Sequence, residues 1–98
     1  MNISINAVKF KIDEKLEDFI NDKASKLEKH FDQITKCEVT LKVDKPESEN
    51  NKVVEMRLHV PGYDLFVGKR ADTFEEAMLD AVDSMKLQIN KFKEKLRE

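Results

Sequence analysis

The chain has 98 residues, 40% hydrophobic and 39% charged, and its 18 Lys and Arg against 20 Asp and Glu give a formal net charge of −2. This composition predicts one domain with a modest two-layer core, which leaves little room for a deep catalytic cavity. With no run of about 18 apolar residues, no basic and apolar leader and one cysteine, we expect a cytoplasmic protein without a membrane segment, a secretory signal or an internal disulfide.

The first half of the chain reads as strand, helix and strand. Residues 2–10 alternate apolar and polar side chains, which predicts a short strand. Asp13 is a candidate N-cap for a helix that extends to about residue 32. Apolar side chains recur at helical spacing behind it, at Leu16, Phe19, Ile20, Leu27 and Phe31. Residues 37–44 alternate strictly and predict a half-buried strand with Cys37 and Val43 among its inward positions.

The second half reads as two strands and a long helix. Residues 46–51 predict a polar turn, residues 53–60 a strand, and Pro61-Gly62 a tight turn into a fourth strand. Thr73 and Glu76 form a capping box at the start of a helix. Its apolar stripe comprises Phe74, Met78, Ala81, Val82, Met85, Ile89, Phe92 and Leu96. We therefore predict an α+β fold of order β-α-β-β-β-α, with both helices packed on one face of a four-stranded sheet whose other face is polar.

Positive charge is gathered in two places although the chain is acidic overall. Lys23, Lys26 and Lys29 repeat every three residues, which places them in an oblique stripe along one flank of the first helix. Residues 86–98 hold five Lys and Arg against two acids. Both helices run from acids to bases, as a helix dipole favours. A solvated, dipole-matched surface and a binding site for a polyanion therefore both remain open.

Other candidate chemistry is thin. His30 flanks the first helix beside Lys26, where contact with phosphate and simple solvation are both open. His59 falls on the outward face of its strand and Cys37 on the inward face, so the two histidines and the cysteine do not form a set of metal ligands. No base is indicated near the Cys37 thiol, and two glycines in total exclude a glycine-rich phosphate loop. We expect no enzymatic activity, no cofactor, no metal and no small-molecule substrate.

Three large side chains lie outside the predicted core stripes. For Tyr63 and Phe66 we favour packing at the turn or at the sheet margin, which argues against a single-strand binder built on stacking platforms. Leu87 falls opposite the apolar stripe of the second helix, so we predict that it is exposed. A lone surface leucine is the simplest interpretation and a contact with another protein is the alternative.

Three segments carry a resemblance to a known family: KASKLEKHFDQI (23–34), CEVTLKV (37–43) and DSMKLQINKFKEKL (83–96). They resemble the ribosome hibernation-promoting factors, also called ribosome-associated inhibitors, ribosomal subunit interface proteins and, in older usage, sigma-54 modulation proteins. The resemblance covers nearly the whole chain and implies a fold similar to a double-stranded RNA-binding domain. It implies occupation of the channel for messenger and transfer RNA on the small ribosomal subunit. Translation would thereby be inhibited and the ribosome would hibernate in stress or stationary phase.

The resemblance also implies a partner and a site. The expected partner is the small ribosomal subunit and its rRNA, with the 70S ribosome as a further candidate. The expected rRNA-binding residues are the two lysine clusters with their neighbours His30 and Lys86, namely Lys23, Lys26, Lys29, His30, Lys86, Lys91, Lys93 and Lys95. Four positions lack a basic or stacking group that the family commonly has, namely Gln33, Glu75, Ser84 and Leu87. These departures bear on the strength and footprint of rRNA contact more than on the fold.

The chain resembles a short form of the family. We expect residues 1–98 to form a single ribosome-binding domain without the C-terminal dimerisation domain of longer members. The alternative function is a protein–protein regulator, for example of a transcription factor. It would act through the charged sheet face or through Leu87.

Overall fold

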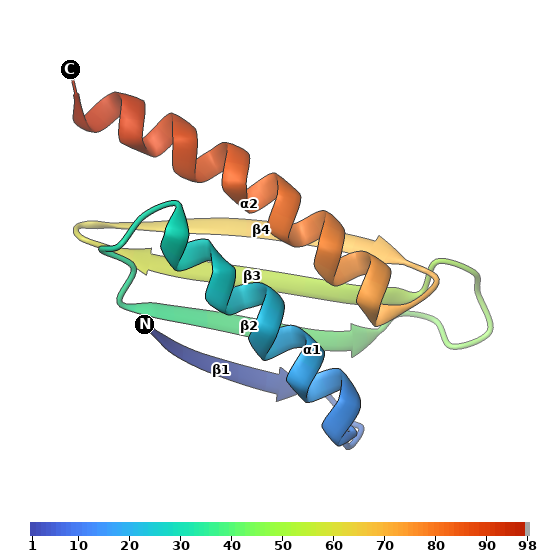
Figure 1. The fold of residues 1–98 in the computed structure, drawn as a ribbon. Coiled ribbons are helices and arrows are strands. Elements are labelled where there is room, and N and C mark those ends of the chain that lie inside the picture. The colour runs from blue at the N-terminus through green and yellow to red at the C-terminus, as the bar shows by residue number, and fades with distance from the viewer. Residues whose placement is uncertain (98) are drawn as a thin grey trace.

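The computed structural model describes residues 1–97 and has the predicted order of elements (Figure 1). The four strands are β1 (Asn2–Ala7), β2 (Lys36–Val43), β3 (Lys52–Val60) and β4 (Tyr63–Ala71), and they form one sheet in the order β1-β2-β3-β4. β1 pairs with β2 in parallel, and the other two pairs are antiparallel. Helices α1 (Glu14–Ser25) and α2 (Phe74–Leu96) cover one face of the sheet. The predicted fold class is therefore confirmed.

Both helices begin at the predicted caps. The backbone N–H of Leu16 donates to Oδ1 of Asp13 at 2.8 Å, and the backbone N–H of Glu76 donates to Oγ1 of Thr73 at 3.1 Å. Each bond satisfies one of the N–H groups that a helix start leaves without an intrahelical partner. The caps fix where each helix starts and therefore which side chains face the sheet.

Two elements are shorter than predicted. β1 ends at Ala7 rather than near residue 10, because the chain turns there and Lys9 adopts a positive φ of 63°. α1 ends at Ser25, whose hydroxyl donates to the carbonyl of Asp22 at 2.8 Å, a side-chain bond of the kind that competes with helix continuation. The chain then tightens into a 3₁₀ helix, η1 (Lys26–Lys29).

One apolar core lies between the helices and the sheet. Its largest fully buried side chains come from α1, η1, β2, β3 and α2, and include Ile20, Leu27, Leu41, Met56, Leu58, Met78, Met85 and Ile89. Two side chains predicted for the core are exposed instead, which corrects the sequence-based assignment. Val43 closes β2 opposite Lys52 at the end of the sheet. Leu96 is 60% exposed because α2 rises away from the sheet toward its C-terminus, so that the strands no longer cover its last turn (Figure 1).

The predicted turns are present. Val60 pairs with Tyr63 across Pro61-Gly62, and Gly62 has a φ of 72°, as expected when proline and glycine occupy the two centre positions of a type II turn. The segment between β2 and β3 holds its shape through Asn51, whose amide Nδ2 donates to the carbonyl of Pro46 at 3.1 Å. Neither α1 nor α2, within residues 1–97, has the length and apolar character that crossing a membrane requires.

Candidate nucleic-acid interface

The strand pairing makes the two helices run in the same direction. β4 is parallel to β1, because β1 is parallel to β2 and two antiparallel pairings follow. Each helix returns across the sheet from the end of one of these strands, so both helix C-termini lie at the same end of the molecule (Figure 1). Both helices carry acids in the first turn and bases in the last. The lysines of α1, η1 and α2 therefore meet at what we call the basic end, defined by Lys23, Lys26, Lys29, Lys91, Lys93 and Lys95.

The 3₁₀ helix aligns two of these lysines. With three residues per turn, Lys26 and Lys29 project from η1 in the same direction, and both are exposed. Lys23 is half-buried at the end of α1, where its Nζ lies 5.4 Å from the centroid of the Phe19 ring. The predicted stripe is thus present, but its lysines differ in their access to solvent.

An acid that the sequence reasoning did not weigh lies within this stripe. A carboxylate oxygen of Asp22 is 3.7 Å from Nζ of Lys23 and 3.4 Å from Nζ of Lys26. Glu28, another acid of this segment, lies 3.7 Å from the N-terminal amine instead. Because Asp22 offsets part of the charge of two lysines, Lys29 is the lysine of this stripe without a carboxylate within 4.0 Å among the residues described.

The lysines of α2 divide between two flanks. Nζ of Lys93 donates to the carbonyl oxygen of His30 at 3.0 Å, which joins α2 to the end of η1. Lys86 lies two turns before Lys93 and therefore shares its flank, beside α1. Lys91 and Lys95, one turn apart, lie on the opposite flank beside β4. His30 itself is half-buried and contributes its backbone carbonyl to this contact.

The four positions that depart from the family pattern lie on the helical side of the molecule or in the loop after η1. Gln33, Glu75 and Leu87 are exposed, and Ser84 is half-buried. Leu87 is 65% exposed, as predicted from its place opposite the apolar stripe. Basic or aromatic side chains at these positions would be accessible to a partner. Their absence therefore changes the charge of the surface and leaves the packing of the core unaffected.

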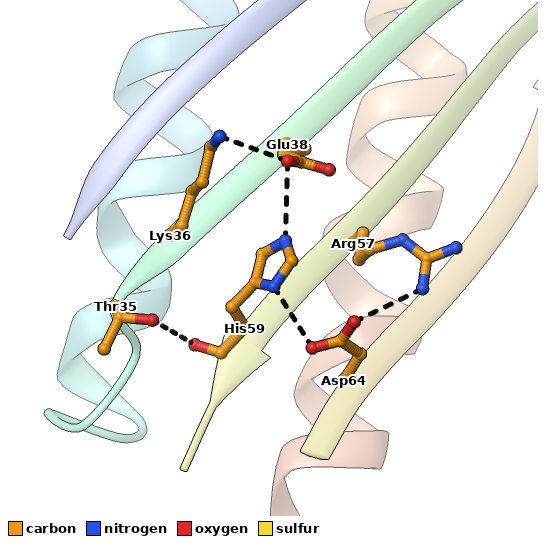
Figure 2. Close-up of polar contacts among 6 residues, drawn as sticks. All are labelled: Thr35, Lys36, Glu38, Arg57, His59 and Asp64. Atoms are coloured by element: carbon orange, nitrogen blue, oxygen red, sulfur yellow. Dashed lines mark hydrogen bonds and ion pairs between the residues drawn. The ribbon is translucent and has the colours of Figure 1, made fainter. Parts of the chain in front are cut away.

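The polar face of the sheet carries charges that neutralise each other (Figure 2). Lys36 lies 3.2 Å from Glu38, and the two ring nitrogens of His59 lie 3.5 Å from Glu38 and 3.1 Å from Asp64. Asp64 in turn lies 3.6 Å from Arg57. The Lys36 ammonium, followed by the His59 ring, holds the pKa of the Glu38 carboxyl below its usual range. This face therefore presents little net positive charge to a polyanion, in contrast to the basic end.

The described residues offer no catalytic constellation. Cys37 is buried in the core, and burial followed by the Glu38 charge raises the pKa of its thiol to about 12, so the nucleophilic thiolate is disfavoured. Within residues 1–97, no three His, Cys, Asp or Glu side chains are grouped so that they could hold a metal ion.

Sequence reasoning missed a hollow on the β4 flank of α2. It has a volume of about 240 Å³ and is lined by Tyr63, Leu65, Gln88, Lys91, Phe92 and Lys95. Tyr63 is 57% exposed, and its ring stacks on that of Phe92 with a centroid distance of 5.8 Å and an interplanar angle of 18°. The spacing of Gln88, Lys91 and Lys95 at three and four residues was the available signal, since such residues share one helix face.

Comparison with known proteins agrees with this fold. Residues 3–97 match the family described as Sigma 54 modulation protein / S30EA ribosomal protein. The chain is 30% identical to the ribosome hibernation promoting factor of Escherichia coli K12 over 98 residues, which covers 100% of this chain and 99% of that protein. It is also 30% identical to the protein of the same name from Azotobacter vinelandii over 95 residues, which covers 97% and 85% of the two chains.

Solved structures share the architecture. A ribosomal subunit interface protein from Coxiella burnetii superposes with a TM-score of 0.85 at 17% identity, covering 95% of this chain and 98% of that one. The N-terminal domain of Thermus thermophilus Protein Y gives 0.79 at 22% identity, covering 94% and 99%. These likenesses show the fold, while the family match shows the relationship. The resemblance read from the sequence is thus confirmed, and the chain belongs to the Sigma 54 modulation protein / S30EA ribosomal protein family.

Proposed function

We propose that this chain is a ribosome-binding factor that occupies the channel for messenger and transfer RNA on the small subunit, inhibits translation and promotes ribosome hibernation in the cytoplasm. The observation that carries the proposal is the basic end, where parallel helices gather lysines on a chain with a net charge of −2. The family is non-enzymatic, and relatives named ribosome hibernation promoting factor support the proposal.

The chemistry of the basic end suits folded rRNA. A lysine that neutralises a phosphate releases condensed counterions, so each contact adds affinity and sensitivity to salt. Phosphate contacts position a protein without reading base sequence. A rigid wall of rRNA is a target of fixed shape, so several lysines on one rigid body can engage it together. The molecule measures 47 × 23 × 19 Å, and such a body in the channel would exclude other RNA sterically.

A role as a protein–protein regulator has weaker support. The sheet face that would serve it already pairs Lys36, Arg57 and His59 with carboxylates. The exposed Leu87 is the observation in its favour. This function would require a stoichiometric protein complex that survives RNase treatment, which ribosome binding through rRNA would not give.

Competition on purified small subunits tests the proposed function. We expect saturating initiator transfer RNA with messenger to weaken binding of this protein and to relieve its inhibition of cell-free translation. A random RNA hairpin of similar mass is the control, and it should bind far more weakly than the subunit. Joint occupancy of the subunit by transfer RNA and this protein, without mutual weakening, would show that the channel is not the site.

A further inference from the structure

We infer that the hollow beside β4 is a site for one unpaired RNA nucleotide, whose base stacks on Tyr63 and whose phosphates meet Lys91 and Lys95. The inference rests on the proposed function and deepens it by naming the element of RNA that this flank of α2 would take. The lysines of η1 and Lys93 face the other flank, so this site would be a second, chemically different contact.

The aromatic floor of the hollow is rigid and partly open. The Tyr63 ring is stacked on Phe92, and the Phe92 ring meets Phe31 edge to face with centroids 5.6 Å apart. One face of Tyr63 is thus held in place from behind, while 57% of the residue stays exposed. A fixed, accessible aromatic face is what a base stacks on in single-strand binders, and such stacking does not depend on base identity.

The rim of the hollow has the charge that a nucleotide requires. Lys91 and Lys95 are its ionised residues, and none of the six lining residues is a carboxylate. Gln88 adds a polar group whose Nε2 donates to the carbonyl of Phe66 at 2.7 Å, and its amide oxygen is of the type that accepts from a base amino group. The combination of a flat apolar surface, two cations and one amide complements a base with its flanking phosphates.

Two other occupants fit less well. A base inside a duplex has both faces covered by its neighbours, so duplex RNA cannot use the Tyr63 ring. An extended peptide would add to the open edge of β4 through backbone hydrogen bonds. The Gln88 side chain already occupies the Phe66 carbonyl at this point of the strand. The unpaired nucleotide is therefore the occupant that the geometry favours.

Tyr63 is the single tyrosine of the chain, which also has no tryptophan, so its ring reports on the hollow directly. We would titrate the protein with an adenosine hexanucleotide and follow the Tyr63 ring protons by NMR. We expect upfield shifts from the base ring current, which an abasic ribose-phosphate hexamer of equal charge would not produce. Equal shifts with the abasic hexamer, or larger shifts with an acidic peptide that contains phenylalanine, would overturn the inference.

Binding to the small subunit gives a second readout. Tyr63→Leu should weaken binding about tenfold, within the range for loss of one stacked base, and should leave the salt slope unchanged. Phe66→Leu is the matched control, since Phe66 is an exposed aromatic on the same strand that lies under Arg57 on the sheet face and should have no effect. Tyr63→Phe should retain parent affinity. Thermal melting of each variant establishes that it is folded.

The outcomes separate the two proposals. If the parent binds the subunit and Tyr63→Leu binds equally well, the nucleotide site is wrong and the proposed function stands. If the parent fails to bind the subunit, the proposed function is wrong, whatever the hexanucleotide does. Loss of binding by Phe66→Leu as large as that by Tyr63→Leu would also overturn the site, because the effect would then not belong to the hollow.

Discussion

Replacement of Lys26 and Lys29 by glutamine tests the basic end most directly. Both side chains are exposed on η1 and project in the same direction, so the change removes charge without disturbing the core. Lys11 and Lys15 offer a matched control, because they are also exposed but lie around the start of α1, at the opposite end of the helix (Figure 1). Each double variant changes the net charge equally.

The expected size of the effect follows from how many RNA phosphates the variant no longer neutralises. Each neutralised phosphate contributes about 0.7–0.9 to the slope of log affinity against log salt, so two phosphates correspond to a decrease of about 1.6 in the slope and to roughly 40-fold weaker binding at 0.1 M salt. Asp22 lies 3.4 Å from Lys26 and already offsets part of its charge. We therefore expect binding to weaken between roughly sixfold, for one phosphate, and 40-fold, for two.

The assay is equilibrium binding to purified small subunits between about 0.05 and 0.3 M salt, with thermal melting of each variant to confirm folding. The Lys26 and Lys29 double variant should bind more weakly and with a shallower salt slope, while the Lys11 and Lys15 variant should follow the parent. An unchanged slope for the first variant, or equally weakened binding for both, would refute the assignment of RNA contact to the basic end.

Three further predictions concern single residues. Asp22→Asn should raise affinity for the small subunit roughly two- to fivefold at low salt by releasing the two lysines it pairs with, whereas Asp18→Asn, one turn earlier and also exposed, should change it less. Because Lys36 and then His59 lower the pKa of Glu38, the parent should unfold at a higher denaturant concentration than Glu38→Gln at neutral pH. This difference should disappear as the pH falls below the usual range of a glutamate pKa, and a difference that grew in acid would contradict the ion pair. The Cys37 thiol, buried and with its pKa raised to about 12, should resist alkylation at pH 8 until the protein unfolds, and rapid labelling of the folded protein would show that the core opens locally.

Most of the fold could be predicted because its signals are local. The alternation in β2 and β3, the Pro61-Gly62 turn and the caps at Asp13 and Thr73 each act over a few residues, and the structure has them where the pattern placed them. The errors lie at element ends. Leu96 continues the apolar periodicity of α2, yet it is exposed because the pattern cannot reveal where a helix rises away from the sheet.

The candidate site could be predicted only in part, because it depends on the relation between elements. The sequence identified the lysines of the basic end but overlooked Asp22, although its spacing of four residues from Lys26 is that of a helical ion pair. Lys93 faces η1 and Lys91 faces β4 because α2 lies between these two elements. The hollow under Tyr63 requires β4 and α2 to be placed side by side, which no local pattern specifies.

We expect the acidic part of the chain to make the proposed RNA contact of the basic end selective. Residues 46–85 hold nine acids and four Lys and Arg, and the loop between β2 and β3, with Glu47 and Glu49, lies at the opposite end of the molecule (Figure 1). Charges more than about 10 Å apart are largely screened at 0.1 M salt, and the molecule is 47 Å long, so the acids of this loop do not cancel the lysines of the basic end. They do repel any polyanion that approaches the other end or wraps the whole surface. Tight binding then requires a target that contacts the basic end alone. A rigid rRNA wall can do so, whereas a long flexible RNA would also meet the acidic surface and be repelled there.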